Sequence, residues 1–305
     1  MLSEQYRNII DSSGKDVLSI KSLKESDYVT TTGRKLQQTF RNFNRNVHIF
    51  RNMFDWQQPQ WNLQREEHPD YILIGWVGLT SHFEDIKKMA PIMKYVHDKY
   101  SNTKFVLSGM AIKDTEVIIT VDAQGNKKYD EKDITDDNKT YRYKVKELFK
   151  DFDQNRIEFN DAVSLEAYGK FYKDLDISLC FVEHNTFNQS KSEIKVIESM
   201  KYCNIPIFSN YGGYNDMYLS MPQDLKNDCK LLAIDSENIN KWKESLDFVL
   251  SNLYIYKGIA QRCRNWVEEE YDINKKIHEK VEFYNTLIEN HIEKEIIKIQ
   301  NILVQ

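Results

Sequence analysis

The chain contains few of the residues that interrupt ordered structure. Among its 305 residues are ten glycines and five prolines, a composition that argues against long disordered stretches. No apolar run reaches the roughly 18 residues that a membrane-spanning helix needs. The N-terminal sequence MLSEQYRNIIDSSGKD also lacks the apolar segment of a secretory signal. We therefore predict a cytoplasmic protein with no membrane span.

Cysteine and net positive charge are also scarce. The four cysteines, Cys180, Cys203, Cys229 and Cys263, form no CxxC pair and lie near no histidine cluster, so neither a metal site nor a disulfide framework is expected. We predict reduced thiols that are mostly packed. The formal net charge of −5 lacks the bulk basic footprint of a duplex-DNA binder, although a local basic patch is compatible with this average.

What the sequence does contain is an alternation of strand-like and helix-like segments. Tyr71–Val77 (YILIGWV) is a nearly continuous apolar run, as expected of a strand buried on both faces. A turn follows, and then helical spacing from Phe83 to Tyr100. The further predicted strands are Lys104–Ser108, Ile157–Phe159, Leu175–Val182, Ile205–Ser209 and Lys230–Ile234, and the further predicted helices are Ser164–Tyr172 and Ser192–Cys203. This alternation predicts an α/β fold with a doubly wound, parallel, Rossmann-like sheet of six strands.

The segments around this core have a different character. Residues 113–139 are polar and predict a surface hairpin with strands at Ile118–Val121 and Lys127–Tyr129. The predicted elements before the core are helices at Val17–Leu23 and Gly33–Phe43 and strands at Asp27–Thr32 and Val47–Phe50. Two short strands do not form a stable sheet alone, so this segment must pack on something else.

The C-terminal part is predicted to be helical and highly charged. One helix ends at Trp266–Tyr271, and a long helix follows from Asn274 to Val304. The last turns of this helix dock on the body or form an oligomer contact. We divide the chain into residues 1–65, residues 66–254 with the sheet, and residues 255–305 with the C-terminal helices.

The first candidate site is the loop that contains Gly78, Thr80, Ser81 and His82. Ligands of doubly wound folds bind at the carboxyl ends of the strands, and the free N–H groups at a helix N-terminus attract phosphate. We predict that this loop binds phosphate. The alternative is that glycine and serine serve turn and cap geometry alone and that His82 is structural.

The second candidate site is the loop with Asn188, Ser190, Lys191 and Ser192, before the helix that carries Glu198. A lysine at a helix start opposes the helix dipole, and a bound diphosphate would remove that conflict. The alternative is that Lys191 and the nearby Lys195 are solvated and that Glu198 pairs with a lysine.

The third candidate site is the glycine pair Gly212-Gly213, which follows the predicted strand Ile205–Ser209. Paired glycines allow a close backbone approach to a ligand. A plain turn is the competing interpretation.

The run from Asn185 to Ser209, NTFNQSKSEIKVIESMKYCNIPIFS, resembles family-4-type glycosyltransferases of the GT-B fold, in particular a phage and bacterial branch. Usual members carry two glutamates separated by seven residues. Glu198 looks like the second of these, which in the family binds the nucleotide ribose. The first would fall at Ser190, so this chain resembles a variant that reads N-x-F-N-x-x-K-S-x-x-K-x-x-E.

This resemblance implies the fold and the roles of the candidate residues. It implies that residues 66–254 are the C-terminal donor domain, that residues 1–65 are a remnant of the N-terminal acceptor lobe, and that the helix through Arg262–Tyr271 crosses back to that lobe. A nucleoside-diphosphate sugar would be the donor substrate, with no further cofactor. Gly78, Thr80, Ser81, His82, Lys191, Ser192, Glu198 and Gly212 would bind it, and Asn188, Ser190 and Lys191 would act in catalysis.

The function implied is retaining, metal-independent glycosyl transfer to a glycan, a protein or modified DNA. We expect most of the acceptor lobe to be absent, so the chain is a fragment or needs a partner polypeptide. Two other classes stay open: a non-catalytic module that binds nucleotide sugars, and a structural protein that assembles through its long C-terminal helix.

Overall fold

The computed structural model describes residues 15–111, 114–121 and 127–303. At its centre lies a six-stranded parallel sheet with the order β10-β9-β8-β3-β4-β7. Its strands are β3 (Ile72–Val77), β4 (Thr103–Met110), β7 (Ile157–Asp161), β8 (Ile177–Cys180), β9 (Ile205–Ser209) and β10 (Ala233–Ile234). The strand order reverses between β3 and β8, which is the doubly wound arrangement. The predicted fold class and the predicted number of strands in this sheet are confirmed.

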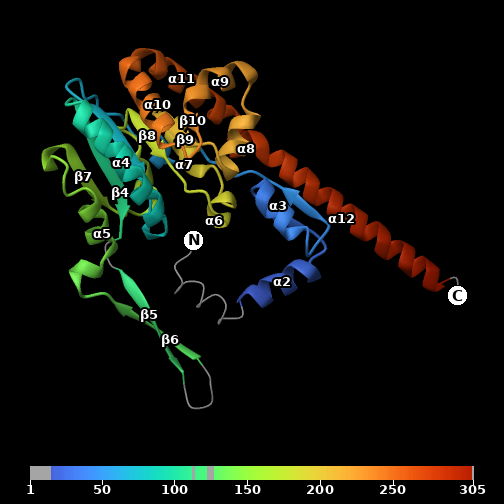
Figure 1. Ribbon diagram of the computed structural model, residues 1–305. Helices are drawn as coiled ribbons and strands as arrows, with labels where there is room; N and C mark the ends of the chain where they lie inside the picture. The colour runs from blue at the N-terminus through green and yellow to red at the C-terminus, as the bar shows by residue number, and fades with distance from the viewer. Residues whose placement is uncertain (1–14, 112–113, 122–126, 304–305) are drawn as a thin grey trace.

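Two layers of helices cover this sheet (Figure 1). One layer contains α4 (Phe83–Lys99), α5 (Tyr141–Leu148) and α10 (Ile239–Ser251), and the other contains α7 (Ile194–Lys201) and α11 (Leu253–Glu270), which pack on each other and on β9. The connections beside β9 are α8 (Gly212–Ser220) and α9 (Gln223–Asp228).

Two predicted elements contain 3₁₀ segments that the sequence analysis does not predict. The predicted helix Ser164–Tyr172 is a 3₁₀ helix, η5 (Leu165–Phe171), which packs against the 3₁₀ turn η1 (Pro59–Trp61). Most of the predicted strand Lys230–Ile234 is the 3₁₀ turn η6 (Cys229–Leu231) and its following residue, so that β10 keeps two residues. The turn directs the side chain of Cys229 into the core, where it is fully buried.

The N-terminal segment packs on the rest of the chain. It contains α2 (Lys15–Glu25), β1 (Val29–Thr31), α3 (Arg34–Phe40) and β2 (Val47–Ile49), with β1 parallel to β2. The rings of His48 and Phe50 lie 4.4 and 5.2 Å from the ring of Phe283 on α12 (Ile273–Leu303). On its other side α3 contacts α8.

A short linker connects this segment to the sheet. Phe54 exchanges backbone hydrogen bonds with the junction of α11 and α12: its N–H donates to the carbonyl of Tyr271 at 2.8 Å, and its carbonyl accepts from the N–H of Ile273 at 2.9 Å. The ring of Trp56 stacks on that of Phe54 at 4.6 Å and meets Trp61 edge-on at 5.7 Å. Buried aromatic side chains therefore fix a stretch that is otherwise polar.

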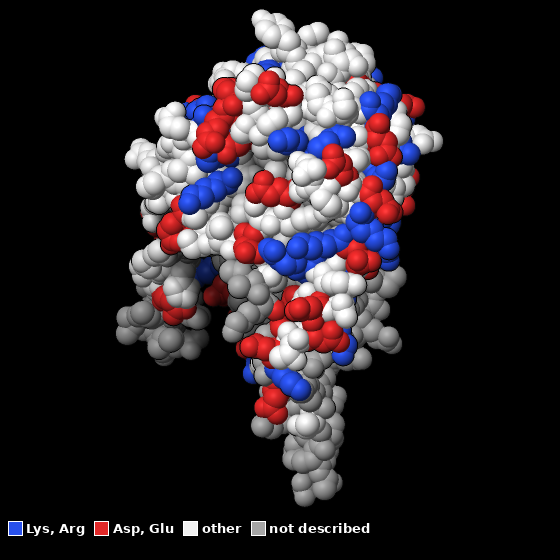
Figure 2. All heavy atoms as spheres, turned by 90° about the vertical axis from the view of Figure 1, so that its left-hand side faces the viewer, with Lys and Arg blue, Asp and Glu red and all other residues white. Residues whose placement is uncertain are grey.

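Two elements project from the body in Figure 1. The hairpin of β5 (Thr115–Val121) and β6 (Lys127–Asp133) is antiparallel and longer than predicted, and the turn at residues 122–126 lies outside the described residues. The long helix α12 agrees with its prediction. No described helix combines the length and the apolar character that a bilayer span requires. In Figure 2, acidic and basic side chains are interspersed on the visible face.

Candidate active site

The loops after β3 and β8 meet where the strand order of the sheet reverses, because these two strands are neighbours. The first loop continues into the 3₁₀ turn η2 (Thr80–His82), and the second contains the one-turn helix α6 (Thr186–Gln189). Together with the start of α7 they gather His82, Lys191 and Lys195, named here the cationic cluster. Sheets of this topology bind ligands at this position.

Asp85, in the first turn of α4, contacts both His82 and the loop that follows β8. One carboxylate oxygen, Oδ2, lies 2.6 Å from Nδ1 of His82, and the other, Oδ1, accepts from the N–H of Glu183 at 2.8 Å and from Nδ2 of Asn188 at 3.0 Å. Burial acts to raise the pKa of Asp85, but these hydrogen bonds outweigh it and lower the pKa. An ionised Asp85 fixes the His82 tautomer with the proton on Nδ1 and leaves Nε2 as an acceptor.

The ammonium of Lys191 lies over the face of the His82 imidazole. Its Nζ is 3.3 Å from both ring nitrogens, and the carbon between those nitrogens blocks an equidistant approach in the ring plane. Nζ also lies 4.5 Å from the centre of the Phe187 ring. Burial, and then the charge of Lys195, lower the pKa of His82 to about 4. His82 is therefore neutral at pH 7.

Lys195 carries a buried ammonium group. Its Nζ has no hydrogen bond in the described part of the chain, and it lies 5.4 Å from the centre of the Trp76 ring. Burial, and then the charge of Lys191, lower the pKa of Lys195 to about 8. A buried charge that is not paired is costly. An anion bound at this point would supply the missing charge.

Glu198 is one of the buried residues of the predicted site. It is 5 % exposed, and its Oε2 accepts a hydrogen bond from the Tyr172 hydroxyl at 2.9 Å. Burial raises the pKa of Glu198 to about 8, against the opposing charge of Lys195. The carboxyl therefore faces Tyr172 and Lys195, and its predicted contact with a ribose stays a prediction.

The structure corrects the reason given for Lys191. Helix α7 begins at Ile194, two residues after the predicted start, because Asn185 caps the separate turn α6 through the N–H of Asn188. Lys191 thus follows the C-terminal end of α6, where a cation suits the helix dipole. The hydroxyl of Ser190 donates to the carbonyl of Thr186 at 3.1 Å.

The residues of the first loop are placed near the cluster but face different surroundings. Thr80 and Ser81 are exposed in η2, which no side chain caps. Gly78 is buried, and a Cβ there would lie 2.3 Å from the Trp76 ring. The structure thus gives Gly78 a packing role beside the one predicted, since it makes room for the ring under Lys195.

The glycine pair Gly212-Gly213 packs against the loop that follows β8. Gly212 begins α8 with φ +55°, and a Cβ on Gly213 would lie 2.5 Å from the carbonyl oxygen of Lys191. The half-buried Ser192 lies in the same contact. Because these two glycines have no side chains, the start of α8 packs directly against the backbone of the loop that carries Lys191. The predicted contact of Gly212 with the ligand stays a prediction.

Four residues of interest were not assigned from the sequence: Lys195, Asp85, Arg51 and Glu193. Spacing gives a signal for two of them. Lys195 lies four residues after Lys191, and Asp85 lies three residues after His82, which is the spacing of neighbouring side chains on a helix. In the structure, Lys191 and His82 lie just before the helices that carry Lys195 and Asp85. Arg51 and Glu193 come together through tertiary packing, for which local spacing gives no signal.

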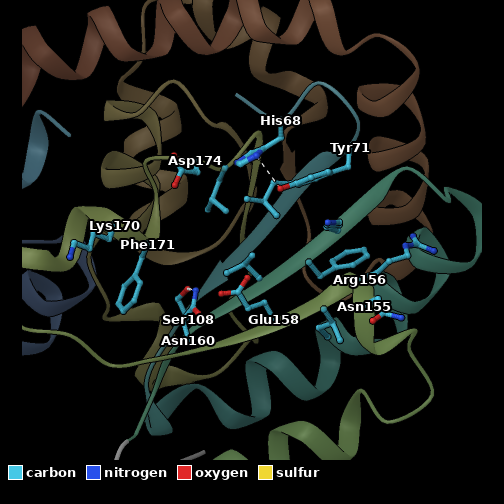
Figure 3. Close-up of a pocket in the computed structure, with 16 residues that line it drawn as sticks. His68, Tyr71, Ser108, Asn155, Arg156, Glu158, Asn160, Lys170, Phe171 and Asp174 are labelled. Carbon is cyan, nitrogen blue, oxygen red and sulfur yellow. Dashed lines mark hydrogen bonds between the residues drawn. The ribbon is translucent and has the colours of Figure 1, made fainter. Parts of the chain in front are cut away.

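A separate hollow of about 360 Å³ lies along β3, β4 and β7 (Figure 3). Two of its basic side chains already have partners within the protein. Arg156 donates to the carbonyls of Tyr100 at 2.6 Å and Thr103 at 2.9 Å, and the Lys104 ammonium lies 4.0 Å from the centre of the Tyr71 ring. We therefore do not place the active site there.

Comparison with known proteins bears on the fold of the chain. No protein-family model and no curated protein sequence matches the chain. Among solved structures, Anabaena Alr3699/HepE in complex with UDP and glucose matches 89 % of this chain and 67 % of its own, at 12 % identity and a TM-score of 0.60. Alpha,alpha-trehalose 6-phosphate synthase from Burkholderia multivorans matches 94 % of this chain and 64 % of its own, at 8 % identity and a TM-score of 0.63. The chain has the GT-B glycosyltransferase fold.

TarM shares the GT-B fold, with a TM-score of 0.58 and 13 % identity over 88 % of this chain and 46 % of TarM. The chain thus spans between about half and two thirds of the length of these three structures. At such identities the likeness concerns the fold, and the chemistry has to be argued from the site itself.

Proposed function

We propose that the chain binds a nucleoside-diphosphate sugar in the cationic cluster and acts in glycosyl transfer. The observation that carries this proposal is the buried ammonium of Lys195, unpaired within the described residues, beside Lys191 at the reversal of the strand order. A diphosphate supplies the negative charge that this position lacks. HepE, which has the same fold, was solved with UDP and glucose.

In the proposed reaction the bond between the anomeric carbon and the diphosphate oxygen breaks, and an acceptor hydroxyl oxygen bonds to that carbon with retention of configuration. The proton of that hydroxyl passes to the departing diphosphate. The negative charge that develops on the diphosphate is stabilised by Lys191, Lys195 and the N–H groups of Gly78–Ser81. These groups make the proposed reaction metal-independent. Asn188 and Ser190 position the loop, and Glu198 binds the ribose.

The acceptor is proposed to be a glycan, a protein or modified DNA, and a partner polypeptide is proposed to supply the acceptor lobe. A cytoplasmic location belongs to the same proposal. The alternative is a module that binds nucleotide sugars without turnover. Release of free sugar or its transfer to an added acceptor separates the two, because the module would bind the donor and leave it intact.

The test is calorimetric titration of the purified chain with UDP-, GDP-, ADP- and TDP-glucose in the presence of EDTA. We expect one of them to bind and its affinity to fall in Lys195→Met, which keeps the length of the side chain and removes its charge. Lys104→Met, in the hollow of Figure 3, is the matched control. Equal affinity for Lys195→Met and the wild type would contradict the proposed site.

A further inference from the structure

A second, smaller pocket lies between the N-terminal segment and α8. Its volume is about 220 Å³. The pocket is lined by Thr32, Gly33, Arg34, Ile49, Arg51, Glu193, Gly213, Asp216 and Met217. Gly213 also touches the backbone of Lys191 and Ser192, so the loop that carries Lys191 separates this pocket from the cationic cluster.

A nearly buried carboxylate forms one wall of the pocket. Glu193 is 4 % exposed, forms no ion pair in the described part of the chain, and faces the Arg51 guanidinium and the Tyr271 hydroxyl. Burial raises the pKa of Glu193. Arg51 donates from Nη1 to the Ser220 hydroxyl at 2.9 Å and keeps further N–H groups for a ligand. A strong acceptor and a strong donor thus lie at the same small pocket.

Arg34 and Asp216 add a second pair of opposite charges to that of Arg51 and Glu193, so the charged side chains of the pocket sum to zero. Nε of Arg34 lies 3.7 Å from Oδ1 of Asp216, so two guanidinium groups and two carboxylates share the wall. An anion would meet the carboxylates, and a cation would meet the guanidinium groups. A hydroxyl group both donates and accepts hydrogen bonds, so a ligand rich in hydroxyl groups suits both kinds of wall.

We propose that this pocket binds a neutral sugar ring, with its hydroxyl groups donating to Glu193 and accepting from Arg51. The volume is below the range of about 300–1,000 Å³ that is usual for drug-sized ligands, which favours a single ring. The identity of that ring rests on the proposed function, since both the donor sugar and an acceptor sugar have this chemistry. The pocket gives the N-terminal segment a part in sugar recognition.

The experiment measures binding of methyl glycosides of glucose, galactose, mannose and N-acetylglucosamine by saturation-transfer NMR and calorimetry. We expect one of them to bind to the wild-type chain and to lose about tenfold or more of its affinity in Glu193→Gln and in Arg51→Met, the scale of a charge-assisted hydrogen bond. Glu158→Gln, the same change in the hollow of Figure 3, should leave the affinity unchanged. Thermal unfolding confirms that each variant is folded.

A nucleotide sugar distinguishes the two sources of the ring. If UDP-glucose or the preferred nucleotide sugar displaces the bound glycoside, the pocket takes the donor sugar. If both bind together, it takes the acceptor sugar. Absence of glycoside binding to the wild type, or equal binding to Glu193→Gln, Arg51→Met and the wild type, overturns the inference even where nucleotides bind. Conversely, glycoside binding that depends on Glu193 in a chain that binds no nucleotide supports the pocket and contradicts the cationic cluster.

Discussion

The cationic cluster and the hollow of Figure 3 both contain basic side chains, but they differ in how those charges are satisfied. In the hollow, Arg156 donates to two backbone carbonyls and Lys104 lies over an aromatic ring. In the cluster, Lys195 is buried and its Nζ has no hydrogen-bond partner among the described residues. In the hollow, these two basic side chains have partners within the protein. The Lys195 ammonium of the cluster lacks a hydrogen-bonded anion among the described residues, and this makes the cluster the better candidate for a ligand site.

The largest expected effect of this difference is on the affinity for the nucleotide sugar. Lys191→Ala and Lys195→Met should each weaken binding by ~1.5–3 kcal/mol, the scale of a charge-assisted hydrogen bond, or roughly 10- to 150-fold in the dissociation constant. The measurement is calorimetric titration. Lys104→Met should bind like the wild type, and a loss in that variant equal to the loss in Lys195→Met would remove the distinction between the two regions.

The pH dependence of nucleotide-sugar binding tests whether the ammonium of Lys195 distinguishes the cluster from the hollow. An anion favours the charged form of Lys195 and raises its pKa above the value of about 8 in the free protein. Binding therefore takes up protons near pH 8, and the dissociation constant should rise by up to about tenfold per pH unit above that point. Titrations between pH 7 and pH 9.5 measure this slope. Lys195→Met should flatten it, and an unchanged slope in that variant would assign the proton to another group.

Glu198 provides a stability test of the buried charges beneath the cluster. Its pKa is higher in the folded state, about 8, than in the unfolded chain, so its contribution to stability is complete below pH 4.5 and is lost as pH rises to about 8. Glu198→Gln stays neutral. The free energy of unfolding of Glu198→Gln should therefore rise relative to that of the wild type, by up to about 1.4 kcal/mol for each pH unit between pH 4.5 and about 8.

Urea denaturation of both proteins at pH 5 and pH 8 checks this difference. A parallel pH dependence in the two proteins would show that Glu198 does not carry the shift. Titration with the nucleotide sugar in the same variant also tests the predicted ribose contact, because the amide keeps the hydrogen bond from Tyr172 but cannot provide a charged acceptor.

The smallest effect on binding is expected in the hollow. Arg156→Met removes the hydrogen bonds to the carbonyls of Tyr100 and Thr103 and should cost about 1–3 kcal/mol of folding stability. The affinity for nucleotide sugars should not change, because the cluster is separate from these contacts. Denaturation and calorimetry of the same preparation give both values. A tenfold loss of affinity in a folded Arg156→Met chain would place a ligand contact in the hollow.

Much of the fold follows from local patterns in the sequence. The apolar runs at β3, β8 and β9 are typical of strands buried on both faces, and their alternation with helical spacing was sufficient to predict the parallel sheet. The predictions failed at 3₁₀ segments such as η5 and η6. Their side chains have the spacing of a strand or a helix, but packing against η1 and the core decides their backbone.

The candidate site was predictable as a set of loops and not as a set of contacts. The sequence places His82 and Lys191 after two strands, and the topology brings them together. It does not show that Lys195 is buried, since burial depends on Trp76 and on the space left by Gly78. It also gives no sign that Arg51 and Glu193, which belong to segments far apart in the chain, line the same pocket.

The hydrogen bonds of Phe54 to the junction of α11 and α12 have a mechanical consequence. Helix α12 has 31 residues and is about 46 Å long at 1.5 Å per residue. Backbone hydrogen bonds at Tyr271 and Ile273 hold its first end to the linker, so a rotation at that junction is amplified along the length of the helix. A rotation of about 5° there moves the far end by about 4 Å. A spectroscopic label at that end would report small changes in the angle at the linker.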